Sequence, residues 1–165
     1  YSINPKLKNE IIKSLAFCSG HTGIAGGQEL DLKFENKKKS LKHIIAMQKK
    51  KTGKLFNFCL YAVGVLAKRS NKEKFFLSTL GEEIGLLFQL ADDFLDIKGS
   101  KKLVGKPIKK DKKKGKSTLI NLMGYEKAHK YANNLKKKIL IKLKKHGKKA
   151  KDLSDTIEFI LGRNF

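Results

Sequence analysis

The segment from Gly81 to Gly99 reads GEEIGLLFQLADDFLDIKG, an apolar helical run that three carboxylates interrupt. In an α-helix Asp92 and Asp96 lie about 40° apart around the axis, and Asp93 lies about 100° from Asp92. The three carboxylates therefore project toward one side. Charge on an apolar face is costly unless it is paired or binds a metal, and Mg²⁺ prefers carboxylate and phosphate oxygens. The segment thus predicts a magnesium site, although acidic residues can also simply form the solvated side of a helix.

The surroundings of the carboxylates favour the metal over the solvated side. Leu90, Ala91, Phe94 and Leu95 are apolar, so we expect this part of the helix to have no wet side. A lysine- and glycine-rich segment follows directly, and its charge suits an anion. A carboxylate cluster before a cationic loop predicts a metal-bridged diphosphate.

Helical periodicity extends over almost the whole chain, and no convincing β alternation appears. The pattern predicts an all-α bundle, which can be half of a larger one, and its apolar stripes form the core. Gly26 and Gly27 are expected to let another helix approach closely, and Ser40 is expected to cap a helix. Helices are expected over Lys6–Gly20, Thr22–Leu32, Leu55–Ala67, Ser117–Met123, Glu126–Lys145 and Asp152–Leu161, with a non-helical loop over Lys101–Lys116.

The size and composition fit one domain. With 165 residues, 40% of them hydrophobic, the chain can bury a core. The longest apolar run, Leu55–Ala67, falls short of the roughly 18 residues that span a bilayer and is expected to be a buried helix. Cys18 and Cys59 lack metal-ligand spacing, so we expect buried free thiols in a reducing cytoplasm. Because the chain opens at Tyr1, we expect a fragment.

The net charge of +23 raises the alternative of a basic nucleic-acid-binding helical protein. Against it, the lysines are spread over nearly every segment, and the only arginines are Arg69 and Arg163. Arginine is the residue that reads guanine and binds phosphate with two parallel hydrogen bonds. The composition therefore favours solvated helix faces, and we expect no nucleic acid as partner.

Further candidate residues surround the aspartate cluster in the sequence. Lys51 and Thr52 fall where a glycine breaks the apolar pattern, and both can contact phosphate oxygens. Gln89 lies one turn before Asp93, and its amide can orient that carboxylate. The segment GKPIKKDKKKGKST adds Lys106, Asp111 and Lys116, which can close over a diphosphate.

Four motifs in this order are the basis of a resemblance: GGQELDL, KTGKLF, GEEIGLLFQLADDFLDIKGS and GKPIKKDKKKGKST. From about Ser19 to Leu122 the chain resembles the C-terminal half of trans-isoprenyl diphosphate synthases. It looks most like the bacterial farnesyl diphosphate (geranyltranstransferase) branch. The closing helices and the terminal LGRNF also fit this family. The resemblance implies the C-terminal portion of a single isoprenoid-synthase helical domain covering residues 1–165.

The resemblance assigns roles by motif. It implies that Asp92, Asp93 and Asp96 hold Mg²⁺ on an allylic diphosphate, with Asp92 the best candidate for direct coordination. Thr52 and Gln89 would line the place where the allylic cation forms. The lysines expected to hold or close over the diphosphates are Lys51, Lys106 and Lys116.

The implied reaction condenses isopentenyl diphosphate with an allylic diphosphate, in a cytoplasmic homodimer. Metal and lysine charge would stabilise the departing diphosphate, and the protein would keep water from the allylic cation. The family's first aspartate-rich motif and its isopentenyl diphosphate segment have no counterpart in this chain, so the chain by itself is expected to be nearly inactive. The alternative within the family is a non-catalytic, regulatory subunit. An extra residue between Lys106 and Asp111 puts the role of Asp111 in doubt.

Overall fold

The computed structural model describes residues 3–104 and 118–163, with side chains described for 3–97 and 118–163. Over these residues the chain is built from helices and contains no strand, which confirms the all-α prediction. The chain divides into two compact units. The first unit comprises Tyr1–Leu32 and Ala46–Leu86, and the second comprises Lys33–Ile45 and Leu87–Phe165.

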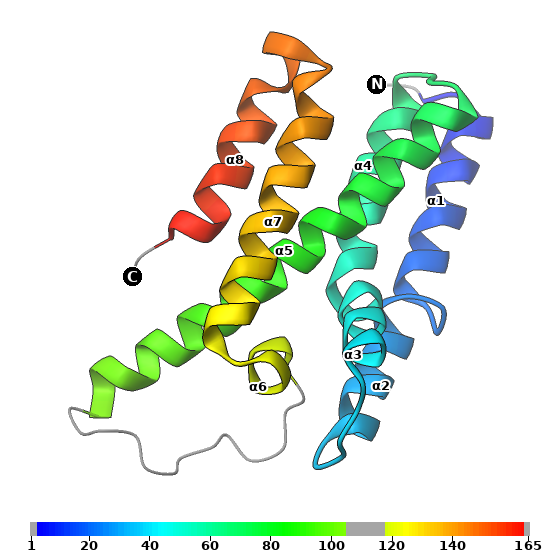
Figure 1. The fold of residues 1–165 in the computed structure, drawn as a ribbon. Helices are drawn as coiled ribbons and strands as arrows, with labels where there is room; N and C mark the ends of the chain where they lie inside the picture. The colour runs from blue at the N-terminus through cyan, green and yellow to red at the C-terminus, as the bar shows by residue number, and fades with distance from the viewer. Residues whose placement is uncertain (1–2, 105–117, 164–165) are drawn as a thin grey trace. The chain divides into compact units, whose positions relative to one another are not determined.

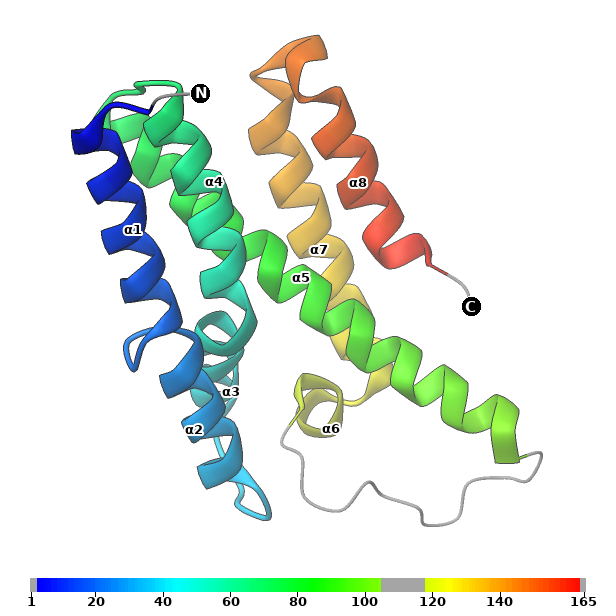
Figure 2. The ribbon, with the colours of Figure 1, turned by 180° about the vertical axis from the view of Figure 1, so that it is seen from behind.

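In the first unit, α1 (Pro5–Ser19) packs side by side with α4 (Lys54–Leu66), as Figures 1 and 2 show. The start of α1 follows from its sequence. The Asn4 side chain accepts a hydrogen bond of 2.9 Å from the Lys6 amide, and Pro5 stands in the first turn. An asparagine cap followed by proline is a typical helix start, because it leaves fewer amides of the first turn without an acceptor. The first unit also contains most of α2 (Ile24–Phe34), the last three residues of α3 (Leu41–Gln48) and the π-helical turn η1 (Lys49–Gly53).

The longest helix, α5 (Asn71–Val104), carries the aspartate cluster. It begins with a capping box: the Glu73 amide donates to the Ser70 hydroxyl at 3.3 Å, and the Ser70 amide donates to the Glu73 carboxylate at 3.1 Å. The expectation of a loop from Lys101 is wrong for its first four residues, because α5 continues through Val104. Glycine and proline, which end helices, follow only at positions 105 and 107.

The second unit contains a hairpin of α7 (Tyr125–Lys144) and α8 (Lys151–Gly162), preceded by the short helix α6 (Leu119–Met123). Figure 1 shows α7 and α8 side by side. A 3₁₀ turn, η2 (Gly147–Ala150), connects them. The expected apolar stripes are confirmed here, because both helices bury side chains at helical spacing. The buried residues are Ala128, Ala132, Ile139 and Leu143 on α7 and Ile157 and Ile160 on α8.

The expectation that Leu55–Ala67 is a buried helix is wrong, because the side chains along one stripe of it are exposed. One stripe of α4 is exposed at a spacing of one helical turn: Leu55 is 50% exposed, Val63 is 58% exposed, and Cys59 between them is exposed as well. A helix that packs by one side keeps its other side uncovered, even where every residue is apolar. Buried free thiols were expected at both cysteines, and this is confirmed for Cys18 but not for Cys59. Burial raises the pKa of the Cys18 thiol.

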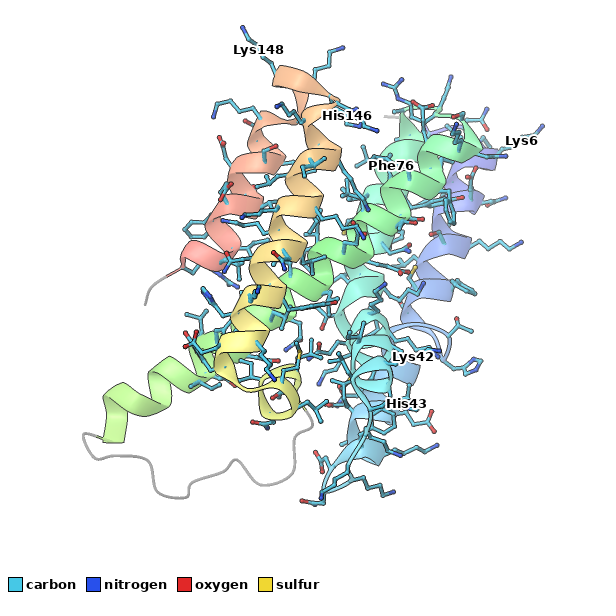
Figure 3. The ribbon with its side chains drawn as sticks, viewed as in Figure 1. Lys6, Lys42, His43, Phe76, His146 and Lys148 are labelled. Carbon is cyan, nitrogen blue, oxygen red and sulfur yellow. The ribbon has the colours of Figure 1, made fainter. Side chains whose placement is uncertain are left out.

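Many of the described lysines lie on solvated helix faces, as their scattered distribution along the sequence predicted. Lys6, Lys42 and Lys148 are exposed, and Figure 3 shows the side chains of Lys6 and Lys148 pointing away from the ribbon. Among residues 3–104 and 118–163, no helix combines the length and the apolar character needed to cross a membrane.

A three-residue cluster ties three helices of the first unit together. The Glu10 carboxylate on α1 accepts a hydrogen bond of 2.9 Å from the Tyr61 hydroxyl on α4 and one of 2.8 Å from the Lys74 ammonium on α5. Hydrogen bonding to Lys74, and then to Tyr61, lowers the pKa of Glu10 below its ordinary value. A carboxyl group whose pKa is lower in the folded state stabilises the fold above its ordinary pKa, and this contribution is lost as the pH falls.

We expect Glu10→Gln to lower the free energy of unfolding by about 1 kcal/mol at pH 7, because both partners lose a charged acceptor. The loss should shrink as the pH falls through the carboxyl range, since the parent then loses the same contribution. Urea unfolding followed by circular dichroism at pH 7 and pH 3.5 measures both. The matched control is Glu158→Gln on α8, where the carboxylate that contacts Lys136 is 56% exposed. This change should cost less than about 0.5 kcal/mol, and an equal cost for both variants would contradict the role of Glu10.

Candidate functional site

Lys51 and Thr52 lie in the π-helical turn η1, which continues directly from α3 and leads directly into α4. The expectation that Gly53 interrupts the helix is therefore wrong, because the backbone widens to a π-turn and stays helical. Such turns insert one extra residue into a helix and often occur at functional sites. Lys51 and Thr52 are both half-buried.

Two glycines allow neighbouring backbones to lie against this turn. A Cβ atom on Gly27 of α2 would lie 2.2 Å from the Lys51 amide nitrogen. A Cβ atom on Gly85 of α5 would lie 2.6 Å from the Gly53 Cα. The close approach expected of Gly27 is confirmed, whereas a Cβ on Gly26 would meet the His21 carbonyl of the preceding segment. Residues without a side chain thus fix the position of the turn that carries Lys51.

Lys51 has a carboxylate partner in the same unit. Its Nζ lies 2.5 Å from Oδ2 of Asp31 on α2, and the Asp31 side chain is only 13% exposed. A second pair lies nearby in the sequence, where Lys54 Nζ lies 2.5 Å from Oε1 of Glu82. Asp31 stands in the GGQELDL motif, but the sequence offered no sign of which cation it pairs with. The pair orients the Lys51 ammonium while leaving 31% of that side chain exposed.

In the second unit the aspartates of α5 have polar partners. The Gln89 amide donates a hydrogen bond of 3.1 Å to Oδ1 of Asp93, which confirms that Gln89 can orient a carboxylate. Asp92 and Asp93 are half-buried and Asp96 is exposed. The expectation of a helix with no wet side is therefore wrong at these positions, because the apolar neighbours Ala91 and Phe94 are buried on other sides of α5.

Arg163, just beyond α8, is a site neighbour that the sequence analysis did not single out. Its Nη2 lies 3.1 Å from Asp92 Oδ1, and its guanidinium lies over the Phe88 ring at 4.7 Å from the centroid. Its Nε donates to the Ile160 carbonyl at 3.1 Å. The sequence offered two signals: Arg163 stands in the terminal LGRNF, and it is one of two arginines among 38 basic residues.

Three sequence candidates lie outside the described residues: Lys106, Asp111 and Lys116. In the part of the chain that the structure describes, no three His, Cys, Asp or Glu side chains gather closely enough to hold a metal ion by themselves. Mg²⁺ commonly takes its remaining oxygen ligands from phosphate and water.

Comparison with known proteins identifies the family. The family model of polyprenyl synthetase matches residues 4–158. The chain belongs to the polyprenyl synthetase family. It is 31% identical over 132 residues to the farnesyl diphosphate synthase of Micrococcus luteus, and 35% identical over 123 residues to that of Bacillus subtilis. The family that the four motifs indicated is thereby confirmed.

Solved structures agree on the fold. An FPP/GFPP synthase from Zymomonas mobilis matches 95% of the chain with a TM-score of 0.80 and 32% identity. A geranyltransferase from Helicobacter pylori, solved with magnesium and isoprenyl diphosphate, matches 97% of the chain with a TM-score of 0.78 and 29% identity. The helices are thus those of an isoprenoid-synthase fold.

The chain spans about half the length of these relatives. The matches cover 80% and 74% of the chain but only 45% of the Micrococcus protein and 40% of the Bacillus protein. The chain also covers 52% of the Zymomonas structure.

We expect Gly27→Ala to destabilise the fold by roughly 3 kcal/mol, because the added methyl group would overlap the Lys51 backbone. The midpoint of thermal unfolding should fall by about 6–12 °C, measured by calorimetry. Gly162→Ala is the control, since no atom lies within 4 Å of a Cβ at that position. A Gly27→Ala protein as stable as the Gly162→Ala protein would show that α2 does not hold the turn.

Proposed function

We propose that this chain is the C-terminal part of a magnesium-dependent trans-prenyltransferase. The reaction condenses isopentenyl diphosphate with an allylic diphosphate, such as dimethylallyl or geranyl diphosphate, to a short-chain product such as farnesyl diphosphate. The observation that carries the proposal is the DDFLD cluster on α5, with half-buried carboxylates that already have polar partners, in a chain whose family is established. The Helicobacter pylori relative, whose structure contains magnesium and isoprenyl diphosphate, supports the substrate class.

The donor set of α5 suits magnesium shared with diphosphate. Asp92 and Asp96 stand four residues apart, which places them on one side of the helix, and both reach solvent. Mg²⁺ is usually bound by one or two carboxylates, with phosphate oxygens and waters as its remaining ligands. When bound, the metal would neutralise charge that develops on the departing diphosphate. Asp92 is proposed as the direct ligand, with Asp93 and Asp96 as further or water-mediated partners.

The remaining roles belong to cations and hydrogen-bonding groups. Lys51, oriented by Asp31, is proposed to bind a diphosphate oxygen through a charge-assisted hydrogen bond. Thr52 and Gln89 are proposed to line the place where positive charge forms on the allylic carbon. By resemblance alone, Lys106 and Lys116 bind and enclose the diphosphate.

The proposal extends to organisation. We propose that residues 1–165 form part of one isoprenoid-synthase domain and that the complete enzyme is a cytoplasmic homodimer. Because the chain spans about half of its relatives, we expect it to bind Mg²⁺ and diphosphate but to turn over negligible substrate by itself.

Thermal unfolding with Mg²⁺ and inorganic diphosphate, compared with EDTA, tests the aspartate site. A ligand at about 100 times its dissociation constant stabilises by roughly 2.7 kcal/mol, or about 5–10 °C for a chain of this size. We expect this shift in the parent and in Asp152→Asn, whose carboxylate is an exposed one on α8. Asp92→Asn should lose most of the shift, whatever its own midpoint in EDTA. An Asp92→Asn protein with the full shift would contradict the proposed metal ligand.

A further inference from the structure

Arg163 makes three contacts within the second unit, and one of them is with Asp92. Its guanidinium pairs with the Asp92 carboxylate, lies over the Phe88 ring and donates to the Ile160 carbonyl. The Arg163 side chain is only 14% exposed, whereas the Asp92 side chain is 42% exposed. The arginine is therefore fixed, while the carboxylate stays open to a ligand from solvent.

The Arg163 guanidinium and a divalent metal ion compete for the Asp92 carboxylate. A guanidinium 3.1 Å from Oδ1 repels a divalent ion that coordinates the same carboxylate. A metal ligand must also present its oxygens to the metal, and one of these oxygens already accepts the Arg163 hydrogen bond. Binding of a metal at Asp92 therefore competes with this ion pair.

We propose that Arg163 is the internal counter-ion of Asp92, and that a divalent metal binds by displacing it. The ion pair keeps the carboxylate oriented and neutralised without metal, and it lowers the affinity for a metal that arrives without diphosphate. Arg163 is thus a positioning residue that acts through Asp92. This inference rests on the proposed function, since it takes Asp92 as the metal ligand.

The alternative is that Arg163 only fastens the end of α8 through Phe88 and Ile160. Removing the charge while keeping an apolar side chain separates the two roles. Arg163→Met retains a flexible side chain and a sulfur that packs well on aromatic rings, but it cannot pair with Asp92. A purely structural role predicts unchanged metal affinity in such a variant.

The test is a titration with Mn²⁺ alone in EDTA-free buffer. Electron paramagnetic resonance measures the concentration of free Mn²⁺ at each step. We expect Arg163→Gln and Arg163→Met to bind Mn²⁺ about three- to tenfold more tightly than the parent, given the strength of charge-assisted pairs that solvent partly screens. Arg69→Gln is the matched control, since Arg69 is an exposed arginine that pairs with Glu73 at 3.9 Å. It should change the affinity by less than about twofold, because solvent and salt screen the charge of an exposed side chain. Adding Asp92→Asn to Arg163→Gln should abolish the gain.

Two results would overturn the proposal that a metal ion displaces Arg163 from Asp92. One is that both Arg163 variants bind Mn²⁺ no more tightly than Arg69→Gln does. The absence of measurable Mn²⁺ binding by all of these variants counts as the same result. The other is a gain that persists in the double variant with Asp92→Asn. If Mg²⁺ and diphosphate still stabilise the parent through Asp92, the proposed function stands and only the displacement of Arg163 fails. If that stabilisation is absent as well, the proposed function itself fails.

Discussion

The position of Lys51 depends on backbone contact that only glycine permits. The π-turn η1 lies against α2 at Gly27 and against α5 at Gly85, with distances that leave no room for a methyl group at either place. Because the turn is fixed in this way, the Lys51 ammonium meets Asp31 instead of extending into solvent. A preorganised lysine loses less conformational entropy when it binds an anion than a free surface lysine does. Other lysines, such as Lys54 and Lys74, also have a carboxylate partner, but Lys51 has its partner while standing in the glycine-packed turn η1.

The aspartate cluster shows how charge is accommodated on a largely apolar helix. Leu90, Ala91 and Phe94 are buried, while Asp92 and Asp93 have polar partners from Arg163 and Gln89. These partners offset the cost of partial burial and hold the carboxylates in defined directions. Such partners also limit the repulsion between neighbouring carboxylates.

Much of this could be predicted from the sequence, and the failures have physical reasons. Helical spacing placed the carboxylates on one side of a helix, and the short contact from Gln89 to Asp93 follows from the same local geometry. Long-range partners such as Asp31 for Lys51 and Arg163 for Asp92 have no local signal, since they depend on how helices pack. The expectation of a buried helix over Leu55–Ala67 is wrong because composition does not tell which side of an apolar helix is covered. The π-turn was missed because its hydrogen bonds differ from those of an α-helix by one residue, which leaves no mark in the sequence.

The proposed function requires a defined diphosphate site that includes Lys51. The alternative is that a chain of net charge +23 attracts diphosphate without any defined site. Calorimetric titration of inorganic diphosphate, with saturating Mg²⁺, into Lys51→Gln and Lys50→Gln tests this requirement most directly. Both variants lose one charge from the same turn. If Lys51 belongs to a diphosphate site, Lys51→Gln should weaken binding at least about tenfold, as expected for a lost charge-assisted hydrogen bond, and Lys50→Gln should weaken it less than about threefold. Equal, small losses for the two variants would contradict the account and leave nonspecific attraction as the explanation.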